Sequence, residues 1–433
     1  MRNFGVVLCL VSCSFFFACG SESPPPGNTG DADLVLLGGS VYTMEPDQPW
    51  AEAIAITGNH IEAVLGSSEE ARPFVGPETR VVDLEGAFVV PGFIDGHIHF
   101  NSAGALLTDI NLLRVSDEEA LQHEVERVVG NIADDEWIVG GMWGAYEQWQ
   151  LGAAEADGGP ASRWLPDRAM IDDLTQANPC LLSSYDRELY LANTPALEAA
   201  GLVAEPMPGM DRRPDGSPTG LIRAGSPALE RIRKRIQPKS NERLLAENRA
   251  ALEELAASGI VEVHDIAKPE QTARLVELQE RGELTCRFWL RPDLSRGEEL
   301  GAAGLTMGLH PVTRVPDPWL RYGALKGYID GIMGTHGALF FEPYDDQPDN
   351  SGHYRRHTSD DPDFATGNME KMYGLLTAAR TAGFVANVHA IGTKGTALML
   401  DTYERLMRDV GHDLEGYRVI NAQVIRPQDF TRF

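Results

Sequence analysis

The chain has 433 residues. This length allows two or three units, for example an α/β barrel of about 250 residues together with a smaller domain. Lys and Arg number 37 against 64 Asp and Glu, so the formal net charge at pH 7 is −27. A field of this sign repels nucleic acid, which excludes nucleic-acid partners as a function class.

The first residues have the pattern of an export signal. Arg2 precedes an apolar run over residues 4–18 that is too short to span a bilayer as a helix. The run ends in Ala18-Cys19-Gly20, similar to a lipobox, although Phe16 stands where leucine is usual. We expect residues 1–18 to be a signal peptide and Cys19 to carry a lipid, with ordinary secretion as the alternative. The expected location is a bacterial membrane surface, or else the periplasm or the exterior.

The next segments differ in composition. Residues 19–32 contain three consecutive prolines and no apolar periodicity, which is typical of a flexible tether. Residues 33–90 contain short apolar runs separated by glycine turns, and Gly58-Asn59 is a hairpin signal. We therefore predict a small β domain over residues 33–90.

Only Cys180 and Cys286 remain after the first twenty residues. Two such distant cysteines cannot build a disulfide framework or a cysteine-rich zinc site. They could form one bridge, but two small buried side chains are the favoured interpretation.

From residue 91 onward, helical and strand patterns alternate. Ser240 can cap a helix that ends at Gly259 and leads into a strand. This alternation predicts a parallel sheet, either a barrel or a doubly wound sheet. The predicted pairs of helix and strand are 240–258 with 260–264, 269–282 with 285–290, 369–382 with 384–389, and 396–410 with 418–420.

Residues from about 134 to 223 interrupt this alternation with glycine, proline and tryptophan, so we expect an insertion or lid. Its aromatic side chains could line an apolar pocket or pack in a core. These side chains are Trp137, Trp143, Trp149 and Trp164. No phosphate-binding glycine loop occurs in the sequence, which leaves an α/β nucleotide-binding protein poorly supported.

The most informative segment is residues 89–100, VVPGFIDGHIHF. His97 and His99 stand at i and i+2 of a predicted strand, so both imidazoles project to one face and can reach one metal ion. A bare pair of histidines with this spacing is usually coincidental, but the preceding PGFIDG is far more specific.

This segment resembles the motif at the end of the first barrel strand in the amidohydrolase superfamily. Further motifs, in order, are similar to the subgroup of N-substituted formamide deformylases and related exported hydrolases, and the likeness covers nearly all of residues 33–433. These motifs are 215–220 (DGSPTG), 259–265 (GIVEVHD), 325–331 (LKGYIDG), 341–344 (FEPY) and 388–392 (VHAIG).

The resemblance implies a (β/α)8 barrel of the TIM type over residues 91–433 that hydrolyses carbon–nitrogen bonds other than peptide bonds. It implies that His97 and His99 bind the more buried metal ion and that Lys326 is the carboxylated lysine bridging two ions. His389 would be the next ligand, and the cofactor would be one or two divalent ions, zinc by expectation. The alternatives are a lysine that reaches solvent at position 326 and a core histidine at position 389.

Two further positions have weaker support. His264 ends a predicted strand and would face the same rim, where it could support the site or contact substrate. Asp330 could orient the surroundings of Lys326. The expected partner is a small amide, and the membrane is contacted through the lipid anchor at most.

The sequence also departs from the family pattern. Asn421 stands where relatives carry a histidine ligand, and an amide oxygen is a weaker ligand for a borderline-soft divalent ion. Glu188 replaces a common histidine, His336 an arginine and Thr393 an aspartate.

Relatives continue past residues 426–430, which look like a helix start, to a strand with an aspartate that binds metal and shuttles the proton. We therefore expect a C-terminally truncated chain and an incomplete barrel, with the catalytic aspartate beyond residue 433. The competing hypothesis is a catalytically degenerate or truncated lipoprotein with a binding or vestigial role.

Overall fold

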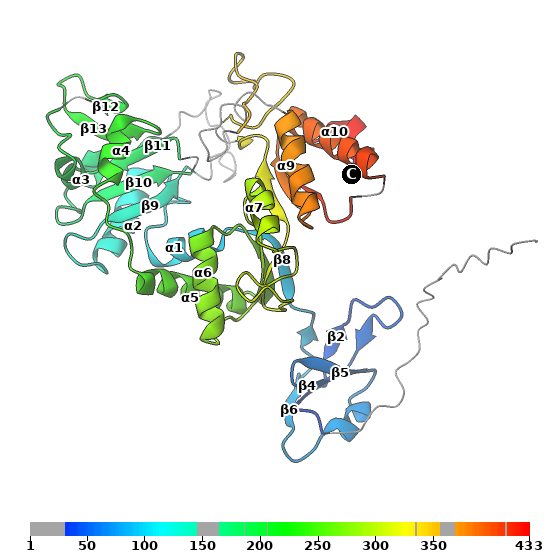
Figure 1. Ribbon diagram of the computed structural model, residues 1–433. Coiled ribbons are helices and arrows are strands. Elements are labelled where there is room, and N and C mark those ends of the chain that lie inside the picture. The colour runs from blue at the N-terminus through cyan, green and yellow to red at the C-terminus, as the bar shows by residue number, and fades with distance from the viewer. Residues whose placement is uncertain are drawn as a thin grey trace, which may run out of the picture. The chain divides into compact units, whose positions relative to one another are not determined.

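The computed structural model describes residues 31–144, 164–185, 187–205, 207–333, 336–355, 369–411 and 414–433 (Figure 1). The expected signal peptide, Cys19 and Trp149 lie outside these residues. The chain divides into two compact units, 1–92 and 93–433. No described helix combines the length and apolar character needed to cross a membrane.

The smaller unit contains two β-sheets. The first has the order β5-β4-β1-β6, and the second has the order β3-β2-β7. Thr57 pairs with His60 across a turn in which Gly58 has a positive φ of 59°, so the predicted hairpin is confirmed. The strands are β1 (Leu34–Leu37), β2 (Ser40–Tyr42), β3 (Trp50–Ala51), β4 (Ala53–Thr57), β5 (His60–Leu65), β6 (Arg80–Asp83) and β7 (Phe88–Val89), with one short helix, η1 (Glu69–Phe74).

The larger unit contains two parallel sheets whose strands follow chain order. One sheet has the order β16-β15-β14-β8 and the other β17-β18-β19. A parallel bridge between Asp293, just past β15, and Lys326 in β17 connects them. The strands are β8 (Phe93–Ile98), β14 (Ile260–Asp265), β15 (Arg287–Leu290), β16 (Leu320–Tyr322), β17 (Leu325–Tyr328), β18 (Ala386–Ala390) and β19 (Arg418–Asn421).

Helices alternate with most of these strands, as the sequence predicted, although β17 follows β16 directly. Ser240 caps α5 by accepting a hydrogen bond from the backbone of Arg243, and Gly259 beyond the helix has a φ of 71°. The α/β class is therefore confirmed, whereas closure of a barrel is not seen in the described residues. The helices are α1 (Phe100–Thr108), α5 (Asn241–Ala257), α6 (Pro269–Glu280), η3 (Leu294–Arg296), α7 (Gly297–Ala302), α9 (Met369–Thr381), α10 (Thr393–Val410) and η5 (Pro427–Arg432).

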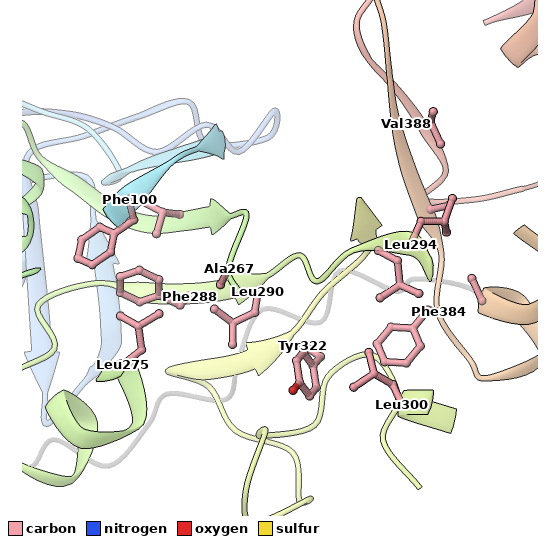
Figure 2. Close-up of a cluster of buried hydrophobic side chains, with 14 of the residues drawn as sticks. Phe100, Ala267, Leu275, Phe288, Leu290, Leu294, Leu300, Tyr322, Phe384 and Val388 are labelled. Carbon is pink, nitrogen blue, oxygen red and sulfur yellow. The ribbon is translucent and has the colours of Figure 1, made fainter. Parts of the chain in front are cut away.

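One continuous hydrophobic core runs through both parallel sheets. Figure 2 shows Phe100 and Phe288 at one end of this core and Phe384 and Val388 at the other, with Leu290 between them. The rings of Phe100 and Phe288 meet edge to face with centroids 5.0 Å apart. Burial of these side chains holds the strand ends that carry the candidate site.

The predicted insertion forms a mixed sheet of its own, with the order β12-β13-β11-β10-β9. Trp143 is buried in its core, and Trp137 and Trp164 pack against its clusters, so these aromatic side chains serve packing. Its action as a lid stays a prediction. The elements are α2 (Glu118–Val129), β9 (Ile138–Trp143), η2 (Arg168–Met170), β10 (Cys180–Ser184), β11 (Leu189–Ala192), α3 (Thr194–Ala199), β12 (Met210–Arg212), β13 (Pro218–Arg223) and α4 (Pro227–Arg233).

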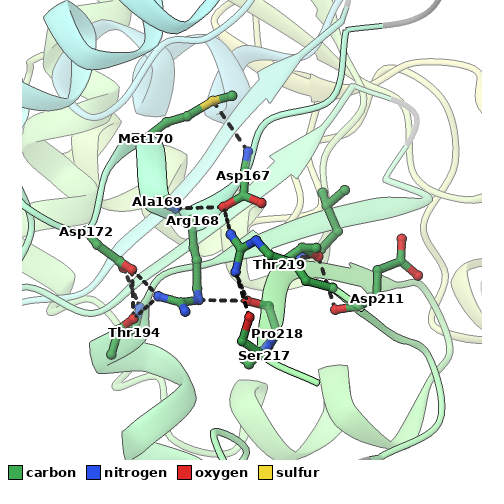
Figure 3. A network of polar contacts seen from close by, with 12 residues as sticks. Asp167, Arg168, Ala169, Met170, Asp172, Thr194, Asp211, Ser217, Pro218 and Thr219 are labelled. Atoms are coloured by element: carbon green, nitrogen blue, oxygen red, sulfur yellow. Dashed lines mark hydrogen bonds and ion pairs between the residues drawn. The ribbon is translucent and has the colours of Figure 1, made fainter. Parts of the chain in front are cut away.

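A polar network fastens η2 to the sheet of the insertion (Figure 3). Arg168 donates from Nε to the carbonyl of Pro218 at 2.8 Å and from Nη1 to Thr194 Oγ1 at 2.6 Å. Asp172 pairs with the same guanidinium, and Asp167 pairs with Arg213. Because the bonds of this network all join residues of the insertion, the network stabilises the insertion itself.

Cys180 and Cys286 are both buried and free, in agreement with the favoured interpretation of two small buried side chains. Burial raises the pKa of each thiol to about 12, so both stay protonated and inert at neutral pH.

Candidate active site

His97 and His99 lie where β8 ends and α1 begins. Their ring centroids are 5.6 Å apart and the rings meet nearly edge to face. His97 is half-buried, and its burial, followed by the charge of Lys326, lowers its pKa to about 3. Partial desolvation and the same lysine lower the pKa of the more exposed His99. Both rings are therefore neutral at pH 7, the state in which imidazole can bind a metal ion.

Lys326 lies in β17 and is 1% exposed, so the alternative of a lysine that reaches solvent is wrong. Its Nζ has no hydrogen-bond partner and stands 4.9 Å from the centroid of the Tyr328 ring. Burial, and after it the charge of Arg291, lowers the pKa of Lys326 to about 7. A buried amine without a partner costs free energy, and a stabilising ligand or a covalent modification would remove that cost.

His389 and Asp330 lie side by side at the ends of β18 and β17. His389 is 6% exposed, and its Nε2 is 3.1 Å from the carbonyl of Gly331 and 3.5 Å from Asp330 Oδ1. Burial lowers the pKa of His389 to about 4, which leaves the ring neutral at pH 7.

The carboxylate of Asp330 accepts hydrogen bonds from the backbone N–H groups of Leu339, Ile391 and Gly392. Asp330 therefore fastens the loop after β17 to the start of α10, directly behind His389. Its Oδ1 lies 3.5 Å from His389 Nε2, and the expected role in orienting the surroundings of Lys326 stays a prediction.

Arg291, just after β15, was not anticipated from the sequence. Its side chain is buried, donates to the carbonyl of Gly96 at 2.8 Å and lies 2.7 Å from His264 Nδ1. Its other contact is a longer one of 3.4 Å to His97 Nδ1. The only available signal was its place at the carboxyl end of a predicted strand, the same edge of the sheet as His97 and Lys326.

His264 stacks on Trp289 and contacts Arg291, so it supports the candidate site from β14, the strand next to β8. Asn421 lies at the end of β19 with a φ of 78°, a left-handed conformation that asparagine tolerates better than most residues. Asn421 pairs with Ala390 of β18, next to His389, and its side chain acts to raise the pKa of His389 against the larger lowering by burial. The substituted position therefore lies close to a candidate ligand.

The other departures from the family pattern have separate surroundings. Both ring nitrogens of His336 are engaged, by Asp346 at 2.8 Å and by Gln347 at 3.2 Å. Thr393 begins α10, and its hydroxyl accepts a hydrogen bond from the backbone of Phe341 at 3.4 Å. Glu188 immediately precedes β11, and its carbonyl accepts a backbone hydrogen bond from Ala224.

A cavity of about 240 Å³ opens beside the start of α1. It is lined from α1, α5, α6 and β9, and its polar side chains include Asn101, Arg187 and Arg274. The positive charge of Arg187 also acts on His99, so this cavity and the histidine pair are neighbours. Asn101 Nδ2 and Arg274 Nε are buried without partners, which leaves donors for a polar ligand.

Among the described residues, no three His, Cys, Asp or Glu side chains are arranged to hold a metal ion. The histidine pair therefore needs a further donor. Lys326 is buried beside it with a free amine, and carboxylation would convert this amine into an oxygen ligand. The residues present fit a metal ion in this sense, with His389 adjacent.

Comparison with known proteins adds the decisive observation. The family model described as "Amidohydrolase family" matches residues 80–433. The chain belongs to the amidohydrolase family. It is 30% identical to "Protein LONG AFTER FAR-RED 3" of Arabidopsis thaliana over 428 residues, which are 95% of this chain and 68% of that protein.

The chain is similar to two further proteins. N-substituted formamide deformylase of Arthrobacter pascens is 24% identical over 393 residues, 88% of this chain and 67% of that enzyme. A crystal structure of a metal-dependent hydrolase from Pyrococcus horikoshii superposes with a TM-score of 0.65 at 22% identity, over 92% of this chain and 72% of that one. The latter shows that the fold is shared. The sequence-based assignment to the amidohydrolases is confirmed, and metal dependence is a property of the family.

Proposed function

We propose that this amidohydrolase hydrolyses carbon–nitrogen bonds of small amides, such as N-formyl or N-acyl amines, with a divalent metal ion. The observation that carries the proposal is the buried, unpartnered Nζ of Lys326 beside the paired rings of His97 and His99. The relative named as a formamide deformylase supports this class of substrate.

His97, His99, a carboxylated Lys326 and His389 would hold one or two ions, and zinc suits imidazole and carboxylate ligands. A bound ion polarises a carbonyl and lowers the pKa of water. The protein supplies neutral imidazoles, and Asp330 keeps His389 in place through its backbone contacts. The cavity beside α1 would receive the substituent of the amide.

Three further features belong to this proposal. The parallel strands β8 and β14 to β19 would be part of a (β/α)8 barrel, because they follow chain order within their two sheets and helices separate most of them. The N-terminal signal and Cys19 would export the chain and anchor it to a membrane. The insertion would act as a lid beside the cavity.

A second candidate function is binding without catalysis, and Asn421 favours it. Asn421 stands next to His389, at a position where the family pattern has a histidine, and an amide there would weaken a second metal position.

Hydrolysis separates the two functions. The zinc-loaded protein is incubated with N-formyl and N-acetyl amines, and release of the free amine is followed. We expect turnover that is lost in a His97→Ala/His99→Ala variant and retained in His123→Ala, an exposed histidine of α2. Zinc binding without turnover on any of these amides would favour the binding function and contradict the proposed one.

A further inference from the structure

Arg291 places a positive charge inside the protein next to the candidate ligands. The side chain is 2% exposed. It donates to the carbonyl of Gly96, one residue before His97, and it contacts His264 on the neighbouring strand. These bonds hold the guanidinium at the ends of β8 and β14.

The described part of the chain offers Arg291 no carboxylate at ion-pair distance, and Asp95 is the one acidic group whose charge acts on it. A buried guanidinium is normally paired, since an isolated buried charge is costly. Strand β17, which bridges to the segment just after Arg291, carries a second basic group without a partner. The backbone N–H of Lys326 donates to the carbonyl of Pro292 at 2.7 Å, which places Lys326 beside the residue that follows Arg291.

The charge of Arg291 also acts on the Lys326 side chain, so two buried basic groups near one another lack an anion. We propose that Arg291 is a positioning residue that provides the counter-charge for a carboxylate formed on Lys326. The inference rests on the proposed function, in which Lys326 is a metal ligand. It adds the residue that stabilises the modified lysine before any metal ion binds.

The chemistry requires dissolved carbon dioxide as the only co-reactant. The neutral Nζ of Lys326 donates its electron pair to the carbon, an N–C bond forms, and one C=O electron pair moves onto oxygen. A proton leaves Nζ to water. The product is an anion where a neutral amine stood, so the fixed positive charge of Arg291 favours it.

Arg291 is held in place independently of that anion. A guanidinium can only donate, so His264 accepts at Nδ1 and carries its proton on Nε2, which lies 3.5 Å from Glu262 Oε1. Since this tautomer suits both neighbours, the guanidinium is ordered before Lys326 is modified. A charged group that is already in place does not have to move when the anion forms, so no free energy is spent on reorganisation.

The test uses the full chain, freed of metal and equilibrated with ¹³C-bicarbonate, with carbamate observed by ¹³C NMR. A Lys326→Met variant identifies the signal. We expect Arg291→Met to weaken carbon dioxide uptake by about tenfold or more, as loss of an adjacent opposite charge predicts. Arg291→Lys keeps the charge and should retain most of the signal. Arg287→Met, at the other end of β15, is the matched control.

Circular dichroism and urea unfolding establish that each variant is folded. If Arg291→Met does not fold, Arg291→Gln, which can still donate to the carbonyl of Gly96, takes its place. The inference is overturned if the wild-type chain forms no carbamate, if Arg291→Met forms as much as the wild type, or if Arg291→Lys loses as much as Arg291→Met. Zinc uptake by the wild type without carbamate would refute the inference and leave the proposed metal site standing.

Discussion

Replacement of Lys326 by methionine should stabilise the metal-free protein, because it removes a buried amine without a partner. The pKa of this lysine falls from 10.5 to about 7 on folding. At about 1.4 kcal/mol per pKa unit, this depression of about 3.5 units corresponds to a cost of about 5 kcal/mol for the fully protonated lysine. Methionine retains the apolar stem and removes the charge.

The same shift predicts a dependence on pH. Between pH 7 and pH 10.5 the unfolded chain binds this proton and the folded chain does not, so stability of the wild type rises with pH. The cost falls by about 2 kcal/mol between pH 7 and pH 9. The advantage of Lys326→Met over the wild type should shrink by that amount across this interval.

Urea unfolding in chelator and in buffer freed of carbon dioxide measures both free energies, with tryptophan fluorescence as the signal. Lys234→Met, at an exposed lysine of the α4 C-terminus, is the control and should leave the pH dependence unchanged. A variant at position 326 that is less stable than the wild type at pH 7, or that keeps the full pH dependence, would refute the reasoning.

The remaining predictions concern residues that hold the loops and helices around the candidate site. Asp330→Asn should lower the free energy of unfolding by about 2 kcal/mol. The carboxylate accepts hydrogen bonds from several backbone N–H groups, and the NH2 group of asparagine would point a donor at one of these donors. Wild-type stability in the variant would contradict this role. Gly104→Ala should cost about 1–3 kcal/mol, since a Cβ would stand 2.4 Å from the carbonyl of Glu247 where α1 crosses α5. Gly374→Ala in α9 meets no atom within 4 Å and should instead add about 0.5–1 kcal/mol in the same urea titrations. Equal effects at the two glycines would refute the close approach of the helices.

Local rules predicted the helices and strands of residues 240–421 well. The cap at Ser240, the stop at Gly259 and the strand after it depend on interactions within a few residues, which a sequence displays directly. The hairpin at Gly58-Asn59 is local in the same sense. The mixed sheet of residues 138–223 was not predicted, because its order depends on pairing between distant strands such as β11 and β13.

The sequence predicted some residues of the candidate site more directly than others. His97 and His99 share a strand, so their spacing alone placed them on one face. Lys326 and His389 came from the family resemblance, and their burial and their effect on the histidine pair emerge only from packing. Arg291 was not predicted as a site residue. Its role depends on its burial without a carboxylate nearby, and a sequence pattern does not reveal which groups surround a buried side chain.

The zinc content of the purified chain tests the account most directly. After exposure to zinc and extensive dialysis, elemental analysis should find about one or two ions per folded chain. The His97→Ala/His99→Ala variant should retain almost none, and Lys326→Met and His389→Ala should each hold less than the wild type. A folded wild-type chain that retains no metal, or a double variant that retains as much as the wild type, would contradict the metal site proposed at the ends of β8, β17 and β18.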